Sequence, residues 1–343
     1  MKAVRKTTEG SGGVELCDIP EPPVSSPNDV KIAVRSGGIC GTDLHIREGG
    51  YGFKPPVTLG HEICGDVVET GASVTRVSPG DRVTVNPTAN GSCGQCRHCH
   101  TGTYFFCKNR KSIGSGVDGG FAEYLTVTEN LVFSLPETIS YDAGALVEPF
   151  ACCVKAVGRY SDIAPGDVAL VCGPGPIGLM CVWLAKQSGA QVIVAGTSVD
   201  GDRLNAARQM GADVAVNIEE ADVTEIIADL SEGYGADIVI DCGGTRGSVN
   251  QCLQAAANGG QYTQVALIEH PFEIDWGRIV YKQLRVQGSI ATDWPSWDLA
   301  IQMVRSGQVD LGQFVSHRHT LDDWETGFDH AVGKIGLKQI LTP

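Results

Sequence analysis

The chain lacks an excess of positive charge. Its 343 residues include 26 Lys and Arg against 40 Asp and Glu, which gives a net charge of -14 and a pI near 5.0. Nucleic acids and anionic membranes are bound through a basic surface. The charge therefore argues against both as partners, whereas it suits a soluble enzyme without selecting its substrate.

A long apolar run is also missing. The N-terminus, residues 1–6, has no apolar segment of signal-peptide length, and the most apolar stretch, 168–185, is interrupted by three glycines and two prolines. Such an interruption suits a turn between a strand and a helix rather than a membrane span. We therefore expect a cytoplasmic protein. Its 13 cysteines, an odd number without a secretory signal, favour thiols and metal ligands over disulfides.

The first half of the chain is rich in short β-prone runs. A length of 343 residues predicts two domains, and runs such as 30–35, 82–85 and 121–127 predict a small β-rich domain, partly a barrel, over residues 1–150. The next stretch, 139–160, has the pattern of a helix, with Ser140 as its N-cap. Pro149 would lie early in a helix or break it.

The stretch from Cys40 to Glu62 places three potential metal ligands close together in sequence, namely Cys40, His61 and Glu62. Zinc binds sulfur, nitrogen and oxygen donors of these kinds, and a catalytic zinc keeps three protein ligands and one open position. A single Cys and a single His are more often a core thiol and a surface imidazole. Two later motifs nevertheless favour a Lewis-acid zinc site here.

Four cysteines lie in one short loop: Cys93, Cys96, Cys99 and Cys107. This spacing lets four thiolates hold a single tetrahedral ion, and no hydrophobic core would require it. Because four sulfurs leave no open position, we expect a structural zinc, with His98 and His100 as solvated loop residues.

From residue 167 the sequence pattern predicts alternating strands and helices. A buried strand, 168–172, leads into Gly173-Pro174-Gly175-Pro176-Ile177-Gly178, then a helix and a second strand, 192–195. A Gly-x-Gly-x-x-Gly motif alone is weak, but this is the context that a dinucleotide site requires. The first two glycines allow a tight turn near a pyrophosphate, and the third lets the helix pack on the sheet.

Further strands at 214–216, 238–241 and 262–267 extend this pattern and predict a doubly wound parallel sheet, a Rossmann domain, over residues 151–290. Residues 291–343 are too short for a third domain, and we expect them to return to the first.

The three motifs in this order resemble zinc-dependent medium-chain dehydrogenases over essentially the whole chain. Val147-Glu148-Pro149 resembles the polyol (sorbitol), L-threonine and sugar-acid dehydrogenase group, because the ethanol-oxidising branch has a cysteine ligand at the position of Glu148. The resemblance implies an α/β fold with a GroES-like catalytic domain and a Rossmann cofactor domain. It also implies two zinc ions per chain and NAD(P).

The resemblance implies catalytic roles for Cys40, Thr42, Asp43, His45, His61, Glu62 and Glu148. Cys40 and His61 would ligate the catalytic zinc, with Glu62 or Glu148 supplying the carboxylate directly or through a bound water. Asp43 would fix the orientation of His61. Thr42 would take the proton of the substrate alcohol, and His45 would pass it to solvent with help from the cofactor ribose.

The cofactor residues implied in the same way are Gly173, Gly175, Pro176, Ile177, Gly178, Gly196, Thr197, Ser198, Arg203, Cys242, Val265, Leu267, Ser289 and Ile290. Gly196 departs from the family pattern, because NAD-specific members carry an acid there for the ribose 2′-OH. Thr197, Ser198 and Arg203 are candidates for binding a 2′-phosphate, although Asp200 and Asp202 would repel it. The balance slightly favours NADP.

The expected activity is hydride transfer between NAD(P) and a secondary alcohol of a polyol, sugar, sugar acid or hydroxy-amino acid. One alternative is a reductase of ketones or aldehydes. Another is a catalytically silent nucleotide-binding sensor or structural protein, which we would expect to have lost one of the catalytic residues. The family implies a homodimer or homotetramer. Four aromatic residues are candidates for the substrate pocket, although aromatics are more often core: Tyr51, Phe53, Trp276 and Trp294.

Overall fold

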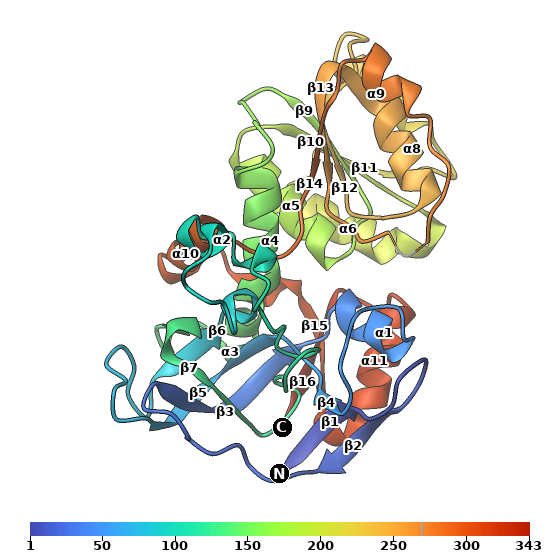
Figure 1. Ribbon diagram of the computed structural model, residues 1–343. Helices are drawn as coiled ribbons and strands as arrows, with labels where there is room; N and C mark the ends of the chain where they lie inside the picture. The colour runs from blue at the N-terminus through green and yellow to red at the C-terminus, as the bar shows by residue number, and fades with distance from the viewer. Residues whose placement is uncertain (269) are drawn as a thin grey trace. The chain divides into compact units, whose positions relative to one another are not determined.

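The computed structural model describes residues 1–268 and 270–343. The chain forms two compact units, of which unit 1 comprises Met1–Ala151 with Ala291–Pro343 and unit 2 comprises Cys152–Ile290 (Figure 1). The C-terminal segment thus belongs to the same unit as the N-terminal half. Among the described residues, none of the helices combines the length and apolar character that a membrane crossing demands.

Unit 1 is built mainly from strands. Its strands are β1 (Lys2–Lys6), β2 (Val14–Asp18), β3 (Asp29–Gly38), β4 (Val57–Thr58), β5 (Glu62–Thr70), β6 (Arg82–Val85), β7 (Tyr124–Thr128), β8 (Val132–Ser134), β15 (Val315–Thr320) and β16 (Lys338–Thr342). Its helices are α1 (Gly41–Arg47), α2 (Arg97–His100), α3 (Tyr141–Ala145), α10 (Trp294–Arg305) and α11 (Trp324–Val332), with α4 (Val147–Gly158) leading into unit 2.

The large sheet of unit 1 has the order β15-β16-β3-β5-β6-β8, with β7 also paired to β3, while β2, β1 and β4 form a smaller sheet. Apolar side chains of β3, β5, β6 and β7, including Ile32, Val67, Val83 and Leu125, form its buried core. The C-terminal strand β16 pairs with β3, which pairs with β5. The end of the chain therefore lies one strand away from β5, the strand that begins at Glu62.

The helix expected over 139–160 is two helices, α3 and α4, separated at Leu146. Pro149 explains the break, because its ring would clash with the carbonyl of Ala145, four residues earlier, in one continuous helix. The expected cap is present, since the side chain of Ser140 accepts a hydrogen bond from the Ala143 N–H at 3.2 Å.

Unit 2 alternates strands and helices. Its strands are β9 (Val168–Cys172), β10 (Gln191–Gly196), β11 (Val214–Asn217), β12 (Ala236–Asp241), β13 (Ala256–Gln264) and β14 (Arg285–Gly288). Its helices are α5 (Pro176–Gln187), α6 (Gly201–Gln209), α7 (Val223–Leu230), α8 (Arg246–Ala255) and α9 (Gly277–Tyr281).

These six strands form one parallel sheet in the order β11-β10-β9-β12-β13-β14. The chain starts in the middle at β9, builds outward to β11, then crosses to β12 and builds outward to β14. In Figure 1, α5 and α8 lie on opposite faces of the sheet. This is the dinucleotide-binding order, in which ligands bind beyond the carboxyl ends of the strands where the order reverses, here between β9 and β12.

Candidate metal centres and cofactor site

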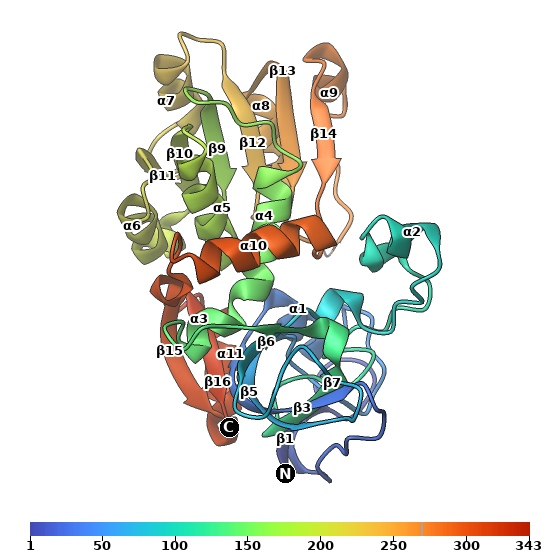
Figure 2. The ribbon, with the colours of Figure 1, turned by 90° about the vertical axis from the view of Figure 1, so that its left-hand side faces the viewer.

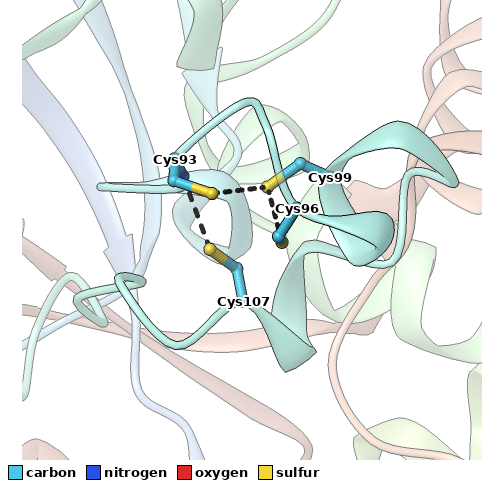
Figure 3. Close-up of side chains that lie close together, drawn as sticks. All are labelled: Cys93, Cys96, Cys99 and Cys107. Atoms are coloured by element: carbon cyan, nitrogen blue, oxygen red, sulfur yellow. Dashed lines mark hydrogen bonds between the residues drawn. The ribbon is translucent and has the colours of Figure 1, made fainter.

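The four loop cysteines of unit 1 come together as one cluster. Their side chains point toward one another in Figure 3, and Figure 2 shows α2 on a loop that projects from the unit. The Sγ atoms of Cys93 and Cys99 are 3.9 Å apart, and those of Cys96 and Cys99 are 3.6 Å apart. A zinc–sulfur distance of about 2.3 Å places the corners of a tetrahedron about 3.8 Å apart, so these thiols fit a zinc ion.

Backbone hydrogen bonds in this loop favour the ionised form of the Cys107 thiol. The Cys93 N–H donates to Sγ of Cys107 at 3.4 Å. This hydrogen bond, with a second from Asn109, lowers the pKa of the Cys107 thiol to about 6. A metal binds the thiolate, so a thiol that is ionised near neutral pH is ready to bind it. His98 lies against Thr103 and Phe106 rather than joining the four sulfurs.

A second cluster of potential ligands also lies in unit 1. Cys40 stands at the start of α1, and Glu62 begins β5 directly after His61. One potential ligand atom from each of these three residues lies within 4.8 Å of the other two. Within residues 1–268 and 270–343, this group and the four cysteines are the sets of three or more Cys, His, Asp or Glu side chains that meet that distance.

The electrostatics of this second cluster favour a cation. Burial by itself would lower the pKa of His61, but the negative charges of Cys40 and Asp43 outweigh burial and raise that pKa well above its ordinary value. Glu148, early in α4, adds to this effect on His61. The site thus attracts positive charge around a sulfur, a nitrogen and a carboxylate, which is a donor set that zinc accepts.

Asp43 fixes the geometry of the cluster from a fully buried position. Its carboxylate accepts hydrogen bonds from the Cys40 N–H at 2.9 Å and the Gly60 N–H at 3.2 Å, and it lies 3.8 Å from Nδ1 of His61. It therefore ties the start of α1 to the segment before β5. Burial raises the pKa of Asp43, and this increase is opposed by His61 and by the two N–H donors.

Glu62 has a partner that the sequence did not reveal. Lys338, the first residue of β16, donates to Oε1 of Glu62 at 2.5 Å, and both side chains are buried. The other carboxylate oxygen, Oε2, is buried and has no hydrogen-bond partner among the described residues. One oxygen of Glu62 is thus held by a lysine, while the second is available to a metal ion or a water.

Gly38 of β3 makes room for that carboxylate. It is paired with Glu62 across the sheet, and a Cβ atom at position 38 would lie 1.9 Å from Oε2. A side chain at this position would therefore displace the carboxylate. No local pattern predicts a role for Gly38 or Lys338, since Gly38 carries no potential ligand although it lies two residues before Cys40, and Lys338 is 276 positions from its partner.

The proposed proton path begins beside Cys40. Oγ1 of Thr42 lies 3.8 Å from Sγ of Cys40. His45, one turn further along α1, is partly exposed. A hydroxyl next to the metal ligands and an imidazole that reaches solvent are the two groups that a proton relay needs.

The glycine-rich turn between β9 and α5 has the predicted form. Gly173 has φ +95, and a Cβ there would lie within 3.0 Å of the backbone of Cys242 and Gly243. A Cβ on Gly178 would lie 2.0 Å from the carbonyl oxygen of Gly173, so this glycine lets α5 approach the turn. Gly175, by contrast, faces open space, which leaves its backbone free for close approach by a ligand.

The other candidate cofactor residues gather at the same edge of the sheet. Pro176 and Ile177 start α5, Gly196 ends β10, and Thr197 and Ser198 follow it. Arg203 lies in α6, Cys242 follows β12, Val265 and Leu267 follow β13, and Ser289 and Ile290 follow β14. Because the strands are parallel, their carboxyl ends all lie along one edge, where a dinucleotide binds.

The aromatic pocket candidates do not form one group. Tyr51 and Phe53 pack against a core cluster of unit 1, and Trp294 packs on Phe133 with ring centroids 5.6 Å apart. Trp276 belongs to unit 2 and is 62% exposed. Packing or exposure thus accounts for all four without a substrate.

Comparison with known proteins identifies both units. Residues 26–137 match the alcohol dehydrogenase GroES-like domain, and residues 176–306 match the zinc-binding dehydrogenase family. The chain is 37% identical to a sorbitol dehydrogenase of Halalkalibacterium halodurans, over 100% of this chain and 99% of that protein. It is 34% identical to an L-threonine 3-dehydrogenase of Symbiobacterium thermophilum, over 100% and 98% of the two chains.

A solved structure agrees with these relatives. A putative zinc-binding dehydrogenase from Sinorhizobium meliloti bound to NADP has a TM-score of 0.89 and 36% identity, covering 100% of this chain and 99% of that chain. The predicted family, fold and class of activity are confirmed. The chain belongs to the zinc-dependent medium-chain dehydrogenases, in the group of polyol-type dehydrogenases, and is an oxidoreductase that transfers a hydride between a secondary alcohol and NAD(P).

Proposed function

We propose that the substrate is a polyhydroxylated secondary alcohol, or a hydroxy-amino acid such as threonine, which the enzyme oxidises to its ketone. The observation that carries this proposal is the Cys40, His61 and Glu62 cluster, together with Glu148 at the position where the ethanol-oxidising branch has a cysteine ligand. The relatives named sorbitol dehydrogenase and L-threonine 3-dehydrogenase support the same substrate range.

In this proposal Cys40 and His61 hold the catalytic zinc, and Glu62 or Glu148 provides the carboxylate. The unpartnered Oε2 of Glu62 supports Glu62 as the direct ligand. The charge of Glu148 acts on His61, which supports a role for it close to the ion or its water. The four loop cysteines hold a second, structural zinc, which makes two zinc ions per chain.

When bound, zinc would supply the Lewis acidity that lowers the pKa of the alcohol, and NAD(P) would supply the acceptor for the hydride. The chain supplies the remaining steps. Thr42 accepts the proton of the substrate hydroxyl, and His45 passes it to solvent. Asp43 keeps Cys40 and the segment before His61 in place through its two backbone hydrogen bonds. Residues after Gly173 bind the pyrophosphate at the start of α5.

We further propose that residues 1–150 with 291–343 form the catalytic domain and 151–290 the cofactor domain. NADP is slightly favoured over NAD, because Gly196 provides no acid for a ribose 2′-OH and a similar structure was solved with NADP. The location is cytoplasmic, which the 13 cysteines support, since all are free thiols in this structure.

We also propose that the protein forms a homodimer or a homotetramer. The strand β14 lies at the edge of the parallel sheet with all four residues exposed, and α9 beside it exposes Val280 and Tyr281. An exposed edge strand with apolar neighbours is a surface that commonly pairs with another chain. Light scattering of the purified protein measures the mass, and a monomeric mass would reject an oligomer.

The test of the proposed function combines zinc content with turnover. The purified protein is analysed for zinc, and absorbance at 340 nm is followed with NAD or NADP and a panel of polyols, sugar acids and threonine. Two zinc ions per chain and cofactor reduction with a panel member are expected. Reduction of ketones without oxidation of any alcohol would favour the reductase instead. Nucleotide binding without turnover in either direction would favour the silent sensor.

A further inference from the structure

A carboxylate occupies hydrogen-bond donors at the end of β10. The backbone N–H of Ser198 donates to Oε2 of Glu219 at 3.1 Å, and the Ser198 hydroxyl donates to the same oxygen. Glu219 comes from the turn after β11, the strand that pairs with β10 in parallel (Figure 1). These two donors lower the pKa of the Glu219 carboxyl, so this group is an anion at neutral pH.

The surrounding residues hold this arrangement together. Asn217 donates from Nδ2 to Oγ of Ser198 at 3.0 Å, and its Oδ1 accepts from the Glu219 N–H at 3.2 Å. The same Nδ2 also donates to Oε1 of Glu220 at 2.8 Å. Ser198 and Asn217 therefore form a small group of donors, and the anion that sits on the Ser198 donors is the carboxylate of Glu219.

The position of these donors relates them to the cofactor. In a dinucleotide site, the residues at the end of the second strand bind the adenosine ribose, at its 2′-OH in NAD or its 2′-phosphate in NADP. Here that strand is β10, and Ser198 is the second residue beyond its end. A hydroxyl and a backbone N–H are the kinds of donor that bind a phosphate.

We propose that Glu219 determines cofactor specificity, because its carboxylate occupies the Ser198 donors that a 2′-phosphate would use. The side chain acts against NADP in two ways, by blocking those donors and by repelling the phosphate, and it therefore limits the slight preference for NADP that Gly196 gives. The inference rests on the proposed cofactor site and deepens it, since it identifies a residue from the turn after β11 in the role that the missing acid at Gly196 has in other members.

The neighbouring charges do not provide the same effect. Asp200 is buried, and its carboxylate is engaged by the N–H and hydroxyl of Thr197, at 3.1 and 2.9 Å. Arg203 is buried close to Asp200, so part of the Asp200 charge is balanced. Glu219 is exposed, and its hydrogen bonds involve the donors themselves. It is therefore the residue whose removal frees them.

The experiment measures the dissociation constants of NAD and NADP by calorimetry for the full-length protein and its variants. Glu219→Ala frees both donors and removes the charge, and we expect the ratio of the NADP constant to the NAD constant to fall about tenfold, the effect of one hydrogen bond to a charged group. Glu219→Gln keeps an acceptor on Ser198 and removes only the charge, so its ratio should fall less.

Glu220→Gln is the matched control. It removes an equal charge at the next residue, and the Glu220 side chain bonds Asn217 and not Ser198. Its ratio should stay close to that of the wild type. Adding Ser198→Ala to Glu219→Ala should abolish most of the gain. An unchanged ratio in Glu219→Ala, or an equal change in Glu220→Gln, overturns the inference. A wild-type protein that binds neither nucleotide overturns the proposed cofactor site instead.

Discussion

The buried pair of Lys338 and Glu62 allows one prediction to be worked out from the structure. Replacing Lys338 by Met keeps the length and apolar stem of the side chain but leaves the Glu62 carboxylate without its cation. Glu62 is fully buried, and among the described residues Lys338 is the side chain that donates to its carboxylate, so no other described group of the chain replaces the lysine. Removing one member of such a pair costs about 3–5 kcal/mol. Since domains are stable by about 5–15 kcal/mol, the loss is a large fraction of the total.

The pH dependence follows from the pKa of Lys338. Burial works to lower this pKa, but the charges of Glu62 and Cys40 raise it above its ordinary value. A raised pKa means that the stabilisation is fully present below the pKa of an unfolded lysine, and is lost as the pH rises through the folded value. The difference in the free energy of unfolding between wild type and Lys338→Met should therefore be largest at neutral pH. It should decrease only in strongly alkaline solution.

The assay is unfolding in guanidinium chloride, followed by circular dichroism, on samples with equal zinc content. Lys2→Met is the matched control, because Lys2 lies in the same unit and bonds Asp322 at 2.6 Å, but both side chains are about half exposed or more. Its stability should hardly change. The double variant Glu62→Gln with Lys338→Met should recover most of the loss, because no unpaired charge remains. A Lys338→Met protein as stable as wild type at neutral pH would refute the reasoning.

Four further variants test the sites. Cys40→Ser should abolish turnover while metal analysis still finds one zinc per chain. Surviving activity would show that Cys40 is not a ligand of the catalytic zinc. Cys99→Ser should lose a zinc and lower the melting temperature, because structural zinc contributes folding energy, and unchanged values would contradict that role. Gly178→Ala should weaken NAD binding sharply in calorimetry, since its Cβ would lie 2.0 Å from the Gly173 oxygen. Glu148→Ala should lower kcat more than stability, and full activity would leave Glu62 as the acting carboxylate.

Much of the fold could be predicted from local patterns. The turn Gly173 to Gly178 lies between a buried strand and a helix because strand and helix periodicities change there, and the structure has both elements. The four loop cysteines were identified by spacing alone, because residues that bind one ion from a short loop must be close in sequence. The pattern over 139–160 predicted a helix in which Pro149 would lie early or cause a break, and the tertiary structure shows the break at Leu146.

The sequence by itself determined which donors are available: a cysteine, a histidine and carboxylates in unit 1, four clustered thiols, and glycines where a backbone must pass closely. Only the tertiary structure decided which partner each charged side chain meets. Lys338 reaches Glu62 because β16 pairs with β3 and β3 with β5, and Glu219 reaches Ser198 because β11 pairs with β10. Strand pairing is a long-range property, so it brings together side chains that no local spacing relates.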